Sequence, residues 1–242
     1  MTAYQPSKQT LAILALLALC TGRPLAWAAD PDLAGAQPAP RVLLTSPPAG
    51  HCTFDPQAAG NAGLATGFKP GVKDASELVA LYVPCDQLER AKAGHVAWLP
   101  EWVAIEKNAV TMPSDDERNG KGTSRQAVDT LCRDAQARHW QIDAETFEAK
   151  TAAAHKSLSA ERPVVYFGVV SNDPQACFMA SLTLESDPLG GRHRMLNIFA
   201  FMAIGNTWIY HTTRRLAEDA SQAQEILYLA KTDARLFLKR NE

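Results

Sequence analysis

Four cysteines remain in this chain once its N-terminal residues are interpreted as an export signal: Cys52, Cys85, Cys132 and Cys177. An even number of cysteines in an exported protein predicts two disulfide bonds, because such bonds form and persist in oxidising compartments. Each bond must bring distant parts of the chain together, which restricts how the chain can fold. We therefore expect a domain held by two disulfides outside the cytosol.

Four cysteines allow three connectivities. The pairing that we favour joins Cys52 to Cys85 and Cys132 to Cys177. The first bond would tie the N-terminal segment to the end of a buried strand, and the second would tie a middle helix to a hairpin. The alternative is a reactive thiol, which calls for a Cys-x-x-Cys motif or a partner histidine. The sequence contains no Cys-x-x-Cys motif, so we interpret the cysteines as structural.

The first 28 residues contain the three parts of a secretory signal. Lys8 supplies a positive charge, an apolar run follows over residues 11–19, and small residues precede a cleavage site after Ala28. The apolar run is shorter than the roughly 20 residues that a membrane-spanning helix needs. We expect a periplasmic or secreted protein with a cleaved signal peptide and no transmembrane segment. A lipoprotein signal at Cys20 is the alternative, but Leu19 stands where a small residue is usual.

The charge balance narrows the class of partner. The chain has 24 basic and 26 acidic side chains, a formal net charge of -2, and loss of the signal removes two of the basic ones, Lys8 and Arg23. A mildly acidic chain without a basic stripe argues against nucleic acid and against anionic membrane surfaces. An unknown envelope protein or a small ligand is the expected partner.

After the signal, the sequence divides into a lead-in and one domain. Residues 29–48 are rich in alanine and proline, which is typical of a linker. Residues 49–242 are enough for a single domain with a sizeable core. In the first part of this domain, apolar runs predict strands over 78–83 and 102–105. Helices are expected over 86–92, from Ser124 onward and over 143–158.

The last third predicts two hairpins and a helix. Strands are expected over 163–170 and 176–184, joined by a turn at 171–174, and over 194–203 and 207–213, joined at 205–206. The final helix is predicted from apolar positions three and four apart: Leu216, Ala220, Ala223, Leu227, Ala230, Ala234 and Phe237. The expected fold class is α+β, an antiparallel sheet with helices packed on it, similar to an αβα sandwich.

Residues 48–55 and 81–88, together with this ending, resemble a group of exported proteobacterial proteins of unknown function. That group has a Gly-x-Cys-x-Leu-Asp opening and a second cysteine directly after a buried strand; here Phe54 replaces the leucine. The hairpin–hairpin–helix order also resembles the PsbP/Mog1-type αβα sandwich, as a fold analogy only. Neither resemblance implies a catalytic residue.

The sequence lacks the motifs of several common chemistries. The histidines are not paired at the spacing of zinc ligands, the loop at 119–124 lacks the Walker pattern, and there is no Gly-x-Ser-x-Gly elbow. We therefore expect no metal and no cofactor, and favour a non-enzymatic binding module or envelope accessory protein. The alternative is a hydrolase-type periplasmic enzyme whose site forms only in the fold, from residues such as Asp173, His193, His211 and the Trp and Tyr side chains.

One group of charged residues is a candidate binding surface. Arg192, His193 and Arg194 begin one predicted strand, and Arg214 and Arg215 end its hairpin partner. Antiparallel pairing would bring these ends together into a positive patch. Such a patch could bind an anion or an acidic partner. The interpretation that we favour is that these charges keep the ends of apolar strands soluble.

Overall fold

The chain forms seven strands and four helices over the residues that the structure describes. The structure is a computed structural model and describes residues 42–61, 64, 76–111, 124–137, 144–205 and 207–242. The strands are β1 (His51–Thr53), β2 (Ser76–Pro84), β3 (Trp102–Thr111), β4 (Val164–Asp173), β5 (Ala176–Ser186), β6 (Arg192–Ile204) and β7 (Thr207–Leu216). The helices are α1 (Cys85–Lys92), α2 (Ser124–Ala137), α3 (Ala144–Ser157) and α4 (Gln222–Asn241). The expected α+β class is confirmed.

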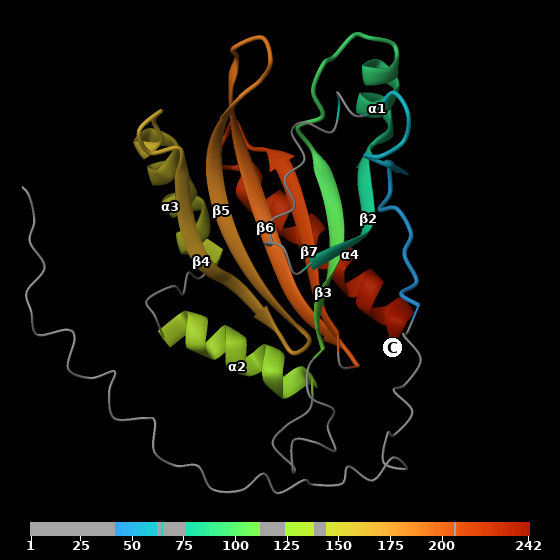
Figure 1. Ribbon diagram of the computed structural model, residues 1–242. Helices are drawn as coiled ribbons and strands as arrows, with labels where there is room; N and C mark the ends of the chain where they lie inside the picture. The colour runs from blue at the N-terminus through green and yellow to red at the C-terminus, as the bar shows by residue number, and fades with distance from the viewer. Residues whose placement is uncertain (1–41, 62–63, 65–75, 112–123, 138–143, 206) are drawn as a thin grey trace, which may run out of the picture. The chain divides into compact units, whose positions relative to one another are not determined.

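All strands belong to one antiparallel sheet, in the order β1-β2-β3-β7-β6-β5-β4 (Figure 1). Strands β4 to β7 form a meander, in which each strand pairs with the next one along the chain. The first three strands join this meander through β3, which pairs with β7 and not with the strand that follows it in sequence. The centre of the sheet is therefore built from both halves of the chain.

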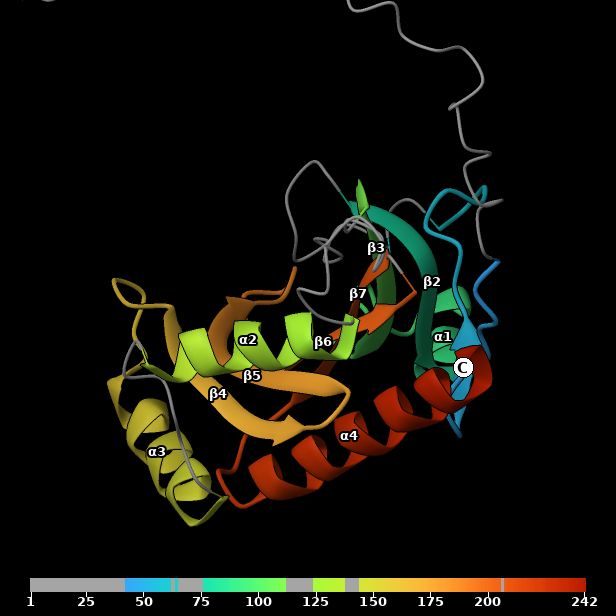
Figure 2. The same cartoon turned by 90° about the horizontal axis from the view of Figure 1, so that it is seen from below.

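Alternation of side chains along the strands gives the sheet two different faces. Phe178 of β5 and Ile198 of β6 point into the largest apolar core, which α3 and α4 close. Their neighbours Cys177 and Phe201 point to the opposite face, where they pack with α2. The sheet is curved, with α2 inside the curve and α4 outside it (Figure 2). We call these two sides the inner face and the outer face.

The terminal helix α4 covers the outer face because one of its sides is apolar. Its buried side consists of Ala223, Ile226, Leu227, Ala230, Ala234, Phe237, Leu238 and Asn241. The helix begins later than the apolar spacing predicts, at Gln222. Leu216 is the last residue of β7, where it pairs with Met195. The β-branched Thr212 and Thr213 favour a strand in the residues just before it.

Several boundaries differ from those expected. Strand β4 continues to Asp173 and β5 starts at Ala176, so the turn between them is shorter than the predicted 171–174. The short strand β1 was not expected, because three residues carry no period-two pattern. It forms by pairing with β2, with Cys52 opposite Val83. Tertiary pairing, and not local sequence, creates this edge strand.

Both favoured disulfides are present. Cys52 on β1 is bonded to Cys85, the first residue of α1, and Cys132 on α2 is bonded to Cys177 on β5. The bonds close loops with sequence separations of 33 and 45 residues. Each bond belongs to an apolar cluster on the inner face, whereas the large outer core contains neither bond.

The compact unit begins at Val42, before the expected domain boundary at residue 49. The end of the lead-in contributes to the fold, because Leu43 packs against the outer core. The expected signal peptide with Cys20, the rest of the lead-in and residues 119–123 of the loop considered for a Walker motif lie outside the described residues. None of the described helices has the length and apolar character needed to cross a membrane.

Candidate functional site

Two apolar clusters occupy the two sides of the inner face. The first packs α1 and the segment before β1 against β2 and β3, through Phe54, Leu81, Val83, Leu88, Ala91, Leu99, Trp102 and Ala104. The second packs α2 against the meander, through Val128, Cys132, Val169 and Cys177. Each cluster contains or adjoins one disulfide. The middle of the inner face, on β3, β7 and β6, lies between them.

The middle of the inner face carries four half-buried aromatic side chains. They are Phe199 and Phe201 on β6, with Trp208 and Tyr210 on β7, and we call them the aromatic surface. Phe201 lies directly opposite Tyr210, and their rings meet edge to face with centroids 5.3 Å apart. Half-buried aromatic rings on a sheet offer apolar contact area at a low cost in side-chain entropy, which favours ligand binding.

Glu106 projects from β3 beside the aromatic surface, directly opposite Tyr210. Only 1% of this residue is exposed, and neither carboxylate oxygen has a hydrogen-bond partner of ordinary geometry among the described residues. Burial raises the pKa of the carboxyl, and a hydrogen bond from the Ser76 hydroxyl opposes that shift. A buried carboxylate without a basic partner is costly. Among the described carboxyls of the inner face, Glu106 therefore has the surroundings that stabilise a negative charge least.

A hydrogen bond positions the phenol of Tyr210 next to this acid. Asn108 Nδ2 donates to Tyr210 Oη at 2.9 Å. This bond uses a lone pair of the phenol oxygen, so the hydroxyl proton of Tyr210 can still be donated. Glu106, Asn108 and Tyr210 thus place an acid, an amide and a phenol together at one edge of the aromatic surface.

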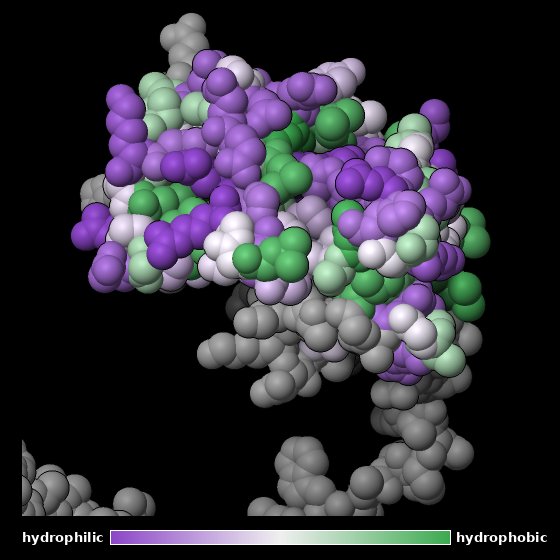
Figure 3. All heavy atoms as spheres, turned by 90° about the horizontal axis from the view of Figure 1, so that it is seen from above, coloured by the Kyte–Doolittle hydropathy of each residue, from purple (hydrophilic) through white to green (hydrophobic). Residues whose placement is uncertain are grey.

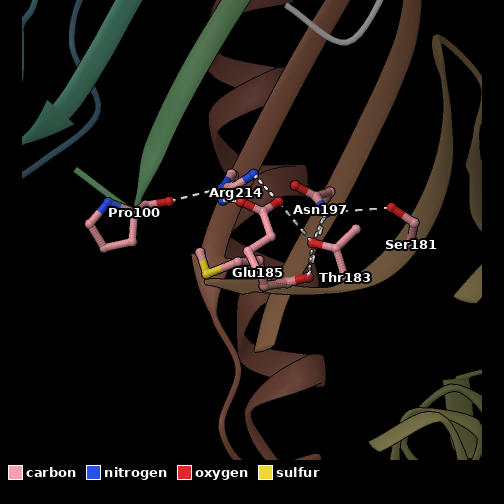
Figure 4. A network of polar contacts seen from close by, with 7 residues as sticks. Pro100, Ser181, Thr183, Glu185, Asn197 and Arg214 are labelled. Atoms are coloured by element: carbon pink, nitrogen blue, oxygen red, sulfur yellow. Dashed lines mark hydrogen bonds and ion pairs between the residues drawn. The ribbon is translucent and has the colours of Figure 1, made fainter. Parts of the chain in front are cut away.

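A polar network lies on the same two strands as the aromatic surface, nearer the end where β6 begins and β7 ends. Figure 4 shows this network. Arg214 donates from its two terminal nitrogens to the Glu185 carboxylate at 2.7 and 2.5 Å, and from Nε to the Pro100 carbonyl at 3.0 Å. Asn197 Nδ2 lies 3.5 Å from the Ser181 hydroxyl and 3.4 Å from that of Thr183. The bidentate pair fixes Arg214 firmly, whereas the long contacts hold the Asn197 amide only weakly.

Arg214 and Arg215, which were expected to share a positive patch, point to opposite faces because they are consecutive in a strand. Arg215 Nη2 lies 3.0 Å from His51 Nε2, and Arg215 Nη1 lies 3.4 Å from Glu101 Oε2. His51 Nδ1 donates to the Ala49 carbonyl at 3.0 Å in the tautomer that satisfies both contacts. Burial, reinforced by the charge of Arg215, lowers the pKa of His51, so this histidine is a neutral acceptor for the guanidinium.

His193 lies between two carboxylates. Its Nε2 is 2.9 Å from Asp187 Oδ2 and its Nδ1 is 3.4 Å from Glu218 Oε1. The hydrogen bond with Asp187 is the main reason that the pKa of His193 is raised. Glu218 also pairs with Arg194, with Oε2 3.6 Å from Nη1, and Arg192 is exposed at the start of β6. The described contacts of His193 include no hydroxyl or thiol that it could activate.

The structure thus brings the predicted patch residues to one end of the sheet and surrounds them with acids. Glu185, Glu101, Asp187 and Glu218 pair with four of the five. Figure 3 views this end and shows mostly hydrophilic side chains with hydrophobic ones between them. Because these carboxylates neutralise the patch, its role as an anion site stays a prediction, and the interpretation as solubilising charge is favoured.

The three residues named for an enzyme site lie apart. Asp173, at the end of β4, pairs with Lys231 at 3.3 Å and Arg235 at 2.7 Å on α4. His211 lies on the outer face, where its ring centroid is 6.4 Å from that of Phe237 and burial lowers its pKa to about 4. His193 is at the opposite end of the sheet from Asp173. No common site is formed by these three side chains.

The described residues contain no group of three or more His, Cys, Asp or Glu side chains arranged to hold a metal ion. His139, one of the scattered histidines considered for zinc, lies outside the described residues. The groups that the described residues place in and around the middle of the inner face are aromatic rings, one buried carboxyl, a phenol and amides.

Sequence reasoning did not single out Glu106 or the aromatic surface. Two sequence patterns could have identified them. Glu106 interrupts the otherwise apolar run that begins at Trp102, at a position where alternation places it on the same face as Trp102 and Ala104. Phe199 and Phe201, like Trp208 and Tyr210, repeat with a period of two, which places each pair on one face of its strand. What the sequence does not contain is the register that brings β3 next to β7.

Comparison of the chain with protein-family models, with curated proteins and with solved structures gave no significant match. The resemblance to exported proteobacterial proteins therefore stays a prediction.

Proposed function

We propose that the protein is exported to the periplasm and binds a small ligand on the aromatic surface without converting it chemically. The observation that carries this proposal is the pairing of half-buried aromatic rings with the buried Glu106 carboxyl on the inner face. A few polar groups among apolar and aromatic side chains are typical of small-molecule sites. The two disulfides support an oxidising compartment.

A small ligand fits the surface better than an envelope protein does. Among the described residues, the large exposed apolar side chains are spread over the lead-in, β4, the β5–β6 turn and α4, and α4 carries three of them: Tyr228, Leu229 and Leu236. Single exposed apolar residues are normal on a folded protein and do not mark an interface. The aromatic rings of the inner face, in contrast, are adjacent to one another and only half-buried.

Binding without conversion is favoured by the way the titratable groups are used. His193 is held between Asp187 and Glu218, and His51 accepts from Arg215, so each makes a fixed structural contact. A general base needs a substrate proton or a nucleophile within hydrogen-bond reach. Because Asp173, His193 and His211 lie apart, the hydrolase-type alternative would need a different set of catalytic residues.

The site can be tested by nuclear magnetic resonance on the mature protein with a panel of small metabolites: amines, amino acids, sugars and carboxylic acids. We expect at least one class to shift the amide signals of Glu106, Phe201 and Tyr210 while leaving those of α4 unchanged. Ligands that shift only the signals around Arg194 and His193 would refute the inner-face site. Conversion of the bound compound over hours would refute the non-enzymatic assignment.

Export is tested separately, by fractionating cells that express the full chain. We expect the protein in the periplasmic fraction with Ala29 as its first residue and both disulfides formed. A lipid-modified N-terminal Cys20 in the membrane fraction would establish the lipoprotein alternative, and an unprocessed chain with reduced cysteines in the cytosol would refute export.

A further inference from the structure

We infer that the ligand of the aromatic surface is an organic cation, bound on the ring of Tyr210 with its charge balanced by the buried Glu106 carboxylate beside that ring. This inference rests on the proposed function, and it adds the chemical class of the ligand. The geometry points to a cation because an acid and several aromatic rings share one small area of the inner face.

The first argument is the unmatched acid. No lysine, arginine or histidine among the described residues pairs with Glu106, although other carboxylates around the sheet have such partners. Lys107, the next residue, is on the other face and pairs with Glu77 at 2.9 Å, and Arg214 is occupied by Glu185. Buried charges are normally paired. A cationic ligand would supply the missing charge, whereas a neutral ligand would leave the acid unmatched and an anion would be repelled.

The second argument is the position of the rings. Tyr210 lies directly opposite Glu106 in the β3–β7 register, and Phe201 lies directly opposite Tyr210 in the β6–β7 register. Side chains directly opposite in an antiparallel pair have neighbouring Cβ atoms. The electron-rich faces of aromatic rings attract cations, and quaternary ammonium groups are bound in this way. Acid and rings therefore favour the same kind of ligand from neighbouring positions.

The third argument is the polar group that remains for the rest of the ligand. The Tyr210 hydroxyl accepts from Asn108 and can donate its own proton. A hydroxyl or carbonyl oxygen carried a few bonds from the charged group could accept this bond. The surface thus fits a compact organic cation with an apolar body and one oxygen acceptor.

Choline and its neutral isostere 3,3-dimethylbutan-1-ol are a matched pair of probes, because they share shape and hydroxyl group and differ in the charge of one central atom. Isothermal titration of the mature, disulfide-bonded protein should give choline an affinity at least about tenfold higher than that of the alcohol. Equal affinities for choline and the alcohol would overturn the inference. The inference would also be overturned if neither choline nor a second organic cation, n-butylammonium, bound detectably.

Two variants locate the effect, each with its own control. Glu106→Gln keeps the shape and removes the charge, and should bring the affinity for choline down to that for the alcohol. Glu77→Gln, on an exposed glutamate of the neighbouring strand, should leave the affinity unchanged. Tyr210→Leu removes the ring opposite Glu106 and should weaken choline binding by about three- to tenfold. Tyr228→Leu removes an exposed tyrosine of α4 and should have no effect. A wild-type affinity in a folded E106Q or Y210L variant would refute the assignment.

The outcomes separate this inference from the proposed function. Shifts at Glu106 and Tyr210 caused by neutral metabolites alone would overturn the cation class and leave the binding function standing. If neither the cations nor the wider metabolite panel perturbed the inner face, both would fall.

Discussion

Asn241, the last residue of α4, pairs with the backbone of Leu44 through its side-chain amide. The Leu44 N–H donates to Asn241 Oδ1 at 2.8 Å, and Asn241 Nδ2 donates back to the Leu44 carbonyl at 3.0 Å. The same Nδ2 also donates to the Phe237 carbonyl at 2.9 Å. Only 3% of Asn241 is exposed, so a buried amide fixes the start of the compact unit to its end.

This contact predicts that Asn241→Ala releases the lead-in. The variant loses two hydrogen bonds to Leu44 and leaves the backbone groups of that residue to water, so a loss of about 1–3 kcal/mol in unfolding free energy is expected. Limited proteolysis should cut the variant near residue 44 much faster than the wild-type protein. Asn61→Ala, at an exposed amide that bonds to Asp55, is the control. Equal cleavage rates in wild type and N241A would contradict the prediction.

Removal of the Cys132–Cys177 bond by a double serine substitution should destabilise the protein. In the chain-entropy description, closing a loop of 45 residues contributes about 4 kcal/mol. Urea unfolding of the double variant should show a midpoint lowered accordingly, with α2 losing amide protection before α4. The control is the wild-type protein measured under the same oxidising conditions. Uniform loss of protection in both helices would show that α2 is not held mainly by this bond.

Glu106→Gln should stabilise the ligand-free protein at neutral pH. Burial raises the pKa of Glu106, so the folded state holds this proton more tightly than the unfolded state. The wild-type protein therefore loses stability as the pH rises through the raised pKa, and the amide removes that loss. We expect E106Q to be more stable by about 1–3 kcal/mol at pH 7. The advantage should shrink as the pH falls from the raised pKa toward the ordinary value of 4.5 and should stay constant below it. Thermal unfolding across this range measures it, with Glu77→Gln as the control.

His211 should contribute to acid unfolding. Burial lowers its pKa to about 4 from an ordinary value of 6.5, so the unfolded state takes up a proton first as the pH falls. Stability should then decrease by up to about 1.4 kcal/mol per pH unit between these values, roughly 3 kcal/mol in total. His211→Gln should flatten this part of the stability–pH curve, and His95→Gln, at an exposed histidine, should not. Parallel curves for wild type and H211Q would contradict the prediction.

The sequence was sufficient for the approximate positions of the helices and long strands, which depend on local patterns, and for the number of disulfides, which depends on a count. The pairing of the cysteines was a choice among three connectivities. It was not sufficient for the charged end. Alternation alone separates Arg214 from Arg215, but the acids that neutralise them, Glu185 and Glu101, come from other strands and loops. Leu216 was placed in a helix because its spacing fits, and pairing with Met195 decided otherwise. Local patterns predict elements, whereas register decides which side chains meet.

The β3–β7 pairing divides the candidate site between the two halves of the chain. Glu106 comes from the N-terminal half-sheet and all four rings come from the C-terminal meander, so the acid and the rings face each other across the seam where these halves join. A chain that crosses a membrane from its N-terminus presents β3 long before β7 arrives. On the proposed export route, the ligand would bind only chains in which β3 has paired with β7, and its occupancy would report that the two halves of the sheet have been joined.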